Sequence, residues 1–106
     1  MRRNETKKGT LNVLADLGFK DAEEISAKLS LAIKLNKVIE KRDLNQAQAA
    51  AITGMTQPKV SQIRRYKIEN ISLERLMKAL VTLDQDVAIT VRPARPTHSA
   101  GISVAA

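Results

Sequence analysis

The middle of the chain, residues 46–66, limits the possible folds more than any other segment, because it reads as two short helices joined by a tight turn. Asn45, followed by a glutamine three residues later, forms a capping-box pattern at the start of the first helix. Gly54 is the residue type that most easily takes the left-handed conformation at a helix end. Thr56 is a suitable N-cap for the second helix, and Pro58 stands in its first turn. The segment therefore predicts a helix-turn-helix unit.

The two short helices have the residues that they need to pack on each other. Alanines dominate the first helix, and small side chains let a second helix cross closely. Val60 and Ile63 share one face of the second helix, and Met55 is expected to lie between the helices as an apolar plug. Polar residues are then left for the outer face of the second helix, which such a unit places in the major groove of DNA.

The same segment resembles the lambda-repressor-like family, also called the XRE or Cro/cI family. In that family a glutamine is followed by a small residue four positions on, a glycine eight on, and aliphatic residues fourteen and seventeen on. The matching residues here are Gln46, Ala50, Gly54, Val60 and Ile63. The resemblance covers about residues 23–83 and implies an all-α, lambda-repressor-like helix-turn-helix bundle. Tyr66 departs from the pattern, because many relatives have a glycine near it, and the path of the following loop stays open.

Positive charge is concentrated around this unit. Residues 41–68 contain six basic residues and one acid, which gives +5 of the chain's formal net charge of +7. Such a concentration is typical of a surface that contacts phosphates. Two amphipathic helices with a glycine turn also occur in proteins that bind no nucleic acid. A helical protein-interaction module that never touches DNA is therefore the alternative from another class.

The candidate DNA-binding residues form two groups. Glutamine can bond adenine and lysine can donate to guanine, so base readout is expected from Gln57, Lys59, Ser61 and Gln62. Phosphate contacts are expected from flanking cations and from the start of the first helix, whose unpaired N–H groups attract anions. These residues are Arg42, Gln46, Arg64, Arg65 and Lys67. The family resemblance implies base contacts mainly at Gln57, Pro58 and Gln62, although Pro58 has no polar side chain.

Two further helices are predicted around the central unit, and residues 21–92 form the predicted domain. Asp21 and Glu24 make a capping-box pattern for a long helix that ends at about Arg42. Its predicted buried stripe is Ile25, Leu29, Ala32, Ile33, Leu35 and Ile39. Ser72 is expected to cap a last helix whose apolar face is Leu73, Leu76, Met77, Leu80 and Leu83.

Residues 1–20 are a predicted N-terminal arm. The first nine are charged, and they fit a solvated tail or, less well, an arm in the minor groove. The next ten, residues 10–19, include the large apolar residues Leu11, Val13, Leu14, Leu17 and Phe19. We expect this apolar part to fold back onto the domain or to dock on a partner.

An alternating pattern follows the last helix. Val87, Ile89 and Val91 alternate with other residues, as in a β-strand, and Pro93 ends the pattern. No second convincing strand is apparent, so we expect antiparallel pairing with the same strand of a second copy. The resulting homodimer would suit two DNA half-sites. The alternative is a coil with chance alternation, and residues 93–106 read as a disordered tail.

The composition does not support several classes of function. The chain has no cysteine, one histidine in the tail, no glycine-rich phosphate loop and no clustered metal ligands. We therefore expect no enzyme, no catalytic residue, no metal, no cofactor and no small-molecule substrate. Aromatic residues make up 2 %, which leaves no stacking platform for single-stranded nucleic acid. Since neither a membrane span nor a secretory signal is evident, we expect a cytoplasmic protein.

Two further segments narrow the resemblance to a HigA-like group of XRE proteins. They are NVLADLGFKDAEE, residues 12–24, and the closing VAITVRP segment. Members of that group are commonly antitoxins that pair with small RelE/HigB-type ribonuclease toxins and repress their own operons. The resemblance implies a homodimeric transcriptional repressor that is also the antitoxin of a type II toxin–antitoxin pair. A stand-alone or phage-type regulator without a toxin is the alternative.

Overall fold

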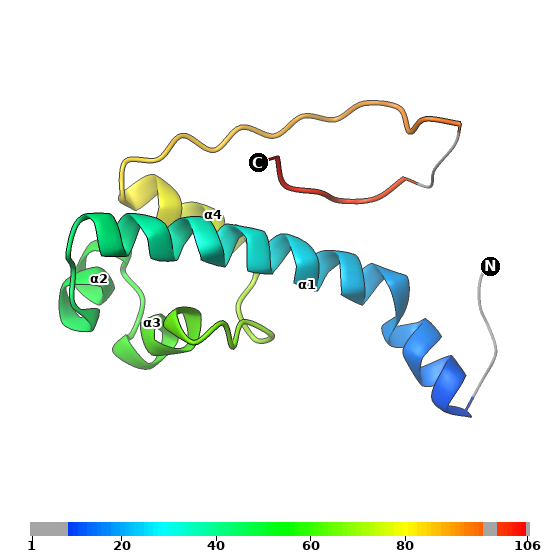
Figure 1. Ribbon diagram of the computed structural model, residues 1–106, viewed down its shortest axis with the longest axis horizontal. Coiled ribbons are helices and arrows are strands. Elements are labelled where there is room, and N and C mark those ends of the chain that lie inside the picture. The colour runs from blue at the N-terminus through cyan, green and yellow to red at the C-terminus, as the bar shows by residue number, and fades with distance from the viewer. Residues whose placement is uncertain (1–8, 97–99, 106) are drawn as a thin grey trace.

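The computed structural model contains four α-helices in the residues that it describes (Figure 1). The structure describes residues 9–96 and 100–105, with side chains from residue 22 onward. The helices are α1 (Gly9–Lys41), α2 (Gln46–Thr53), α3 (Gln57–Arg64) and α4 (Leu73–Thr82). Within these residues there is no strand, and the all-α part of the prediction is confirmed.

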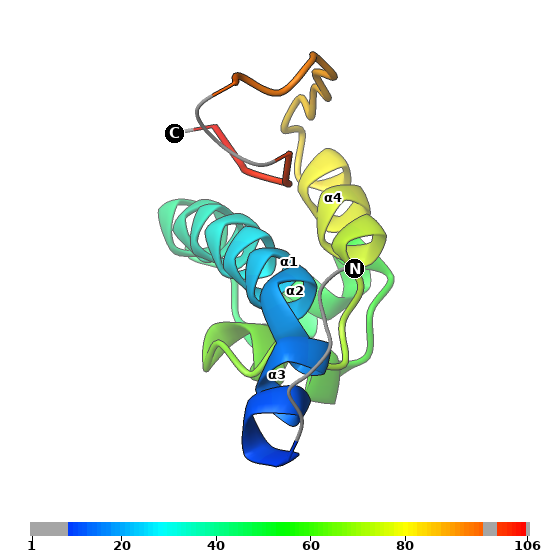
Figure 2. The same ribbon diagram turned by 90° about the vertical axis from the view of Figure 1, so that its right-hand side faces the viewer.

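The long helix α1 runs through the molecule, and the three short helices pack around its C-terminal half (Figure 1, Figure 2). α1 contacts α3 and α4, and α2 also contacts both of these helices. The four helices therefore surround one core. Its largest fully buried side chains are Leu35, Val60, Ile63, Ile68, Ile71, Leu76 and Leu83. Full burial of such a side chain contributes about 1.5–3 kcal/mol to the stability of the fold.

The predicted start of the long helix is wrong. α1 begins at Gly9 and continues through Asp21, so Asp21 is not an N-cap, which would need extended backbone. Residues 9–20 of the predicted arm are instead the N-terminal end of α1, and this end projects away from the bundle (Figure 1). The predictions about the side chains of Leu14, Leu17 and Phe19, and about residues 1–8, lie outside the described part of the chain.

The predicted buried stripe of α1 is half wrong. Ala32, Leu35 and Ile39 are buried as predicted, but Ile25, Leu29 and Ile33 are 40 %, 37 % and 44 % exposed. Four other residues complete the buried face: Ala27, Lys28, Leu31 and Asn36. Hydropathy favoured the large aliphatic side chains, whereas the line of contact with α3 and α4 decides which residues are buried.

The last helix follows the prediction closely. The Ser72 hydroxyl oxygen accepts a hydrogen bond from the backbone N–H of Arg75 at 3.0 Å, as an N-cap does. Leu76, Leu80 and Leu83 are buried. Leu73 and Met77 are half-buried and pack against the core.

The chain after α4 is extended and runs back along α1 (Figure 1). Val87 is half-buried against the core, while Ile89 and Val91 are 74 % and 91 % exposed. The described part of this single chain gives the segment no strand partner, so the strand and the dimer stay predictions. The tail returns to α1, because Val104 packs on the core, which differs from the expected disorder. Gly101 of the tail also lies close to Glu23 of α1, because a Cβ added to Gly101 would be 2.6 Å from Glu23 Oε2.

Candidate nucleic-acid interface

Local hydrogen bonds fix both ends of α2. The Asn45 side chain accepts from the Gln48 N–H at 2.8 Å, and the Asn45 N–H donates to Gln48 Oε1 at 2.9 Å, which is a complete capping box. Gly54 ends the helix with φ 75°, and its N–H donates to the carbonyl of Ala50. The predicted caps of this helix are confirmed, and they position Gln46 as its first residue.

Contacts between residues close in sequence also stabilise the turn and the start of α3, as they do for α2. The Thr56 hydroxyl oxygen accepts from the Lys59 N–H at 3.3 Å, and Pro58 lies in the first turn. Met55 is 5 % exposed, and Val60 and Ile63 are each 1 % exposed. One face of α3 is therefore anchored in the core, and the opposite face is left for contacts with another molecule.

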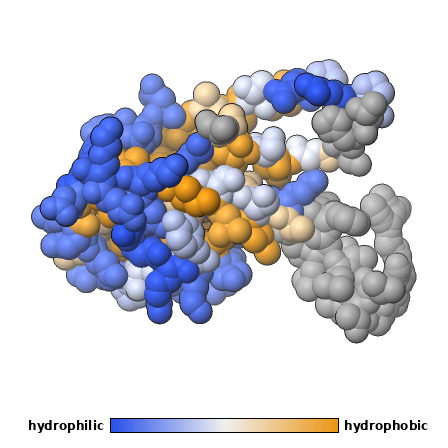
Figure 3. Space-filling view, viewed as in Figure 1, coloured by the Kyte–Doolittle hydropathy of each residue, from blue (hydrophilic) through white to orange (hydrophobic). Residues whose placement is uncertain are grey.

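The predicted base-contacting residues all belong to α3, where Gln57 is exposed and Lys59, Ser61 and Gln62 are half-buried. Gln57 and Lys59 belong to the first turn of the helix, and Ser61 and Gln62 follow within the same eight residues. Hydrophilic residues (blue in Figure 3) cover the end of the molecule that α2 and α3 form. Side-chain amides, a hydroxyl and an ammonium group presented on one helix can donate to and accept from base edges in a major groove.

The structure shows the path of the loop after α3, which the sequence left open because of Tyr66. Tyr66 has φ 60°, so it takes the left-handed conformation that a glycine adopts more easily. The Tyr66 N–H donates to the carbonyl of Ile63 at 3.0 Å, and the Lys67 N–H donates to that of Gln62 at 2.8 Å. These bonds close the end of α3 and place Lys67 on the surface next to it.

The five residues predicted to contact phosphates do not have the same surroundings. Gln46, Arg65 and Lys67 are exposed, and Arg65 Nε donates to the carbonyl of Ser61 at 3.4 Å. Arg42 Nη2 instead donates to the carbonyl of Leu83 at 2.7 Å and to Asp84 Oδ2 at 3.0 Å. These contacts join the end of α1 to the end of α4.

Arg64 is bonded within the fold as well. Its Nη1 donates to Asn36 Oδ1 at 2.9 Å, and its Nη2 lies 3.3 Å from Glu40 Oε2. Both partners belong to α1. Sequence reasoning missed Asn36, which is 2 % exposed; its position between Ala32 and Ile39 on one helix face was the available signal.

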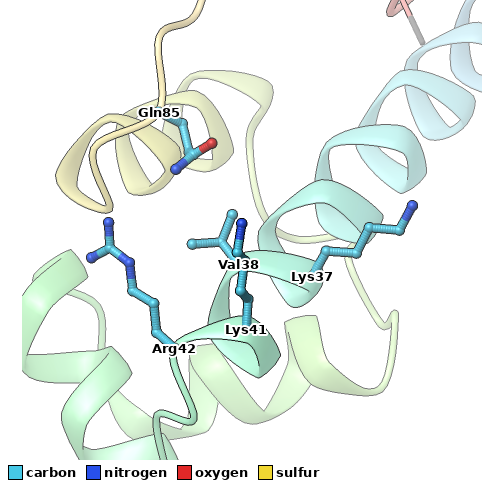
Figure 4. Close-up of a pocket in the computed structure, with 5 residues that line it drawn as sticks. All are labelled: Lys37, Val38, Lys41, Arg42 and Gln85. Atoms are coloured by element: carbon cyan, nitrogen blue, oxygen red, sulfur yellow. The ribbon is translucent and has the colours of Figure 1, made fainter.

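An open hollow of about 470 Å³ lies beside the end of α1, on the α4 side (Figure 4). Its lining residues are Lys37, Val38, Lys41, Arg42 and Gln85. None of them belongs to α2 or α3. The basic surface of the protein therefore extends beyond the helix-turn-helix unit.

Residues 13–92 match the family model of a helix-turn-helix domain. A solved structure named as a putative XRE family transcriptional regulator is 53 % identical to the chain, with a TM-score of 0.74. The match covers 81 % of this chain and 98 % of that one. The chain belongs to the XRE family of helix-turn-helix proteins. Among proteins with curated descriptions, none matches this XRE protein.

Neither a metal cluster nor a membrane span is found in the described part of this XRE protein. Among these residues, no group of three or more acidic or histidine side chains could hold a metal ion. No described helix combines the length and the apolar character that crossing a membrane requires.

Proposed function

We propose that this protein binds a double-stranded DNA operator through α3 and acts as a transcriptional repressor. The observation that supports this most is the preformed α2–turn–α3 unit. Its buried residues pack in the core, and the four predicted base-contacting residues, Gln57, Lys59, Ser61 and Gln62, all belong to α3. Membership of the XRE family, and the name of the solved structure, agree with this function.

Within the proposed complex, α3 lies in the major groove and reads bases with those four residues. Gln46, Arg65 and Lys67 contact phosphates beside the groove. The exposed start of α2 favours an anion, because its first N–H groups and its dipole point outward. Phosphate contacts hold the register of the protein on DNA, and contacts to base edges give specificity.

Operator binding is tested with the DNA upstream of the gene, in a gel shift or by fluorescence anisotropy at several salt concentrations. We expect a complex whose log affinity falls linearly with log salt, and which binds the upstream DNA more tightly than a scrambled duplex of equal composition. If no duplex is bound even at low salt, the protein-interaction module is the better description.

We further propose that the repressor is a homodimer joined through Val87, Ile89 and Val91. Ile89 and Val91 are large apolar side chains that are mostly exposed in the single chain, and their segment is extended. An edge with unpaired backbone groups is a ready template for pairing with another strand. Sedimentation of the wild-type protein tests the dimer, and a monomer at micromolar concentration would contradict it.

A role as antitoxin is the finer proposal, and it rests on the HigA-like resemblance. The exposed stripe Ile25, Leu29 and Ile33 supports it, since this stripe lies on α1 next to the projecting end of that helix. Exposed apolar surface of this kind is typical of protein contacts. The test is co-expression with the protein of the neighbouring gene.

Deletion of residues 1–18 is expected to abolish neutralisation of the toxin and to spare operator binding. If the shortened protein still neutralises the toxin, or if it unfolds, the N-terminal segment is not the toxin-binding part. A neighbouring gene whose product is harmless alone would favour the stand-alone or phage-type regulator.

A further inference from the structure

The C-terminal end of α3 is attached to the middle of α1 by a small polar cluster. Asn36 Nδ2 donates to the backbone carbonyl of Ile63 at 3.0 Å. The same amide accepts from Arg64 Nη1 through Oδ1 at 2.9 Å. Arg64 Nη2 then forms an ion pair with Glu40 at 3.3 Å. The cluster thus joins two residues of α1 to the last turn of α3, over a sequence separation of 27 residues between Asn36 and Ile63.

Because Asn36 is buried, its side-chain amide needs hydrogen-bond partners within the protein. Asn36 is 2 % exposed and lies on the same face of α1 as the buried Ala32 and Ile39. Inside a core, an amide is tolerated only where its donors and acceptors find partners, because water cannot replace them. Both hydrogen bonds of the Asn36 side chain are directed at the end of α3, and its backbone carbonyl also accepts from Arg64 Nη1 at 3.4 Å. Its amide therefore holds α3 in one orientation.

The apolar contacts of α3 do not set that orientation to the same degree. Val60 and Ile63 anchor the helix by burial, which is not directional. Hydrogen bonds lose strength steeply when their angle changes, and a guanidinium group has a planar fork of donors. The directional bonds of the Asn36–Arg64–Glu40 cluster add a restraint on the tilt and roll of α3 to its packing against α1 and α2.

We propose that Asn36 and Arg64 are positioning residues for DNA binding: they hold α3 at the angle that fits the groove, and Arg64 does not neutralise a phosphate. The proposal rests on the proposed function, since it assumes that α3 reads DNA. It replaces the expectation from the sequence that Arg64 contacts a phosphate. Arg65, the next residue, is exposed and stays assigned to a phosphate.

The two adjacent arginines make a matched experiment. Arg64→Met and Arg65→Met each remove one positive charge and leave an unbranched apolar stem. The affinity of each full-length variant for the operator is measured against salt, at a temperature well below its unfolding transition. For Arg65→Met the slope of log affinity against log salt should fall by about 0.9 for each phosphate that is no longer neutralised. For Arg64→Met the slope should stay that of the wild type, and affinity should fall about tenfold, as on removal of one base contact.

The variant Arg64→Lys separates the effect of the planar guanidinium group from the effect of its positive charge. Lysine keeps the positive charge, but a single ammonium group cannot reproduce the planar fork between Asn36 and Glu40. The variant should therefore bind nearly as weakly as Arg64→Met. A phosphate contact, in contrast, would be kept by lysine. Wild-type affinity in Arg64→Lys, or a reduced slope in Arg64→Met, would overturn the proposal.

Asn36→Ala tests the cluster without any change of charge. In the folded variant, operator affinity should fall with an unchanged salt slope, and adding Arg64→Met should weaken binding little further, because both changes break one cluster. If Asn36→Ala lowers the melting temperature but leaves affinity unchanged, Asn36 is merely structural and the proposal fails. If Asn36→Ala does not fold, the Arg64 variants decide. If the wild type itself binds no operator, the proposed function fails first.

Discussion

Substitution of Gly54 tests whether the turn between α2 and α3 depends on backbone conformation and not on side-chain packing. Its φ of 75° lies in the left-handed region, where a residue with a Cβ is strained. The space around it is open, because a Cβ added to Gly54 would meet no heavy atom within 4 Å. The variant Gly54→Ala therefore introduces backbone strain and no steric clash.

The expected decrease in stability follows from two opposing terms. Placing an L-residue in the left-handed conformation costs about 1–2 kcal/mol. Alanine regains about 0.4–1 kcal/mol, because it restricts the unfolded chain more than glycine does. The free energy of unfolding of Gly54→Ala should therefore be lower by about 1 kcal/mol. In a domain of this size the melting temperature falls by about 4–8 °C.

Urea unfolding followed by circular dichroism measures this change, with Gly54→Asn as the control. Asparagine tolerates the left-handed conformation better than alanine, so the control should lose less stability. The dependence of unfolding free energy on urea should be the same for all three proteins. A decrease above about 3 kcal/mol in Gly54→Ala would refute the open turn, since it exceeds the strain of one residue. A variant more stable than the wild type would refute the left-handed conformation itself.

Further variants test the other assignments. Gln57→Ala and Gln62→Ala should each lose about 1–3 kcal/mol of discrimination at one base position per half-site. Binding-site selection measures this, and unchanged preference in both would defeat the base contacts. Ile89→Pro should give a monomer in sedimentation, with operator affinity greatly reduced, because it removes a ladder donor and the gain from two linked half-sites; an intact dimer would rule out the strand. Arg42→Ala should lower the unfolding free energy by about 1 kcal/mol, since the Leu83 carbonyl is deprived of a charged donor. Its salt slope for DNA should stay unchanged, and a lower slope would return Arg42 to the phosphate contacts.

The α2–turn–α3 unit could be predicted because its determinants are local. Asn45, Gly54 and Thr56 each act on backbone groups within four residues of themselves, and the structure contains all three caps. The apolar spacing of α4 is local in the same way, since Leu76 and Leu80 lie one turn apart on one face. Short-range chemistry of this kind can be worked out from a single sequence.

The buried face of α1 could be only half predicted, because it is not decided locally. Ile25, Leu29 and Ile33 make a regular apolar stripe, yet the adjacent line through Lys28 and Asn36 is the buried one. Lys28 Nζ donates to the carbonyl of Glu69, a residue 41 positions away in the sequence. Partners this distant are invisible to a pattern that extends over a few helical turns.

The role of a cation near DNA is also difficult to predict from the sequence, because its partners in the fold can be distant in the chain. Arg42 and Arg64 count toward the positive charge around the helix-turn-helix unit just as Arg65 does. Their partners Asp84 and Asn36 lie 42 and 28 positions away, so the sequence gives no sign that these guanidinium groups are engaged. On the proposal made above, the net charge of this segment overestimates the number of its phosphate contacts, because the fold uses two of the cations itself.

The proposed role of Arg64 follows from the length of α3. A helix of eight residues is too short to be stable by itself, so its direction must come from the surface on which it packs. α3 packs through buried aliphatic side chains and contacts both α1 and α2, and recognition of base edges requires a fixed angle. On the proposal made above, the polar bonds from α1 add to this packing the directional restraint that base readout needs. The salt dependence of operator binding should accordingly reflect the exposed cations beside α3, Arg65 and Lys67, and be smaller than the six basic residues of segment 41–68 suggest.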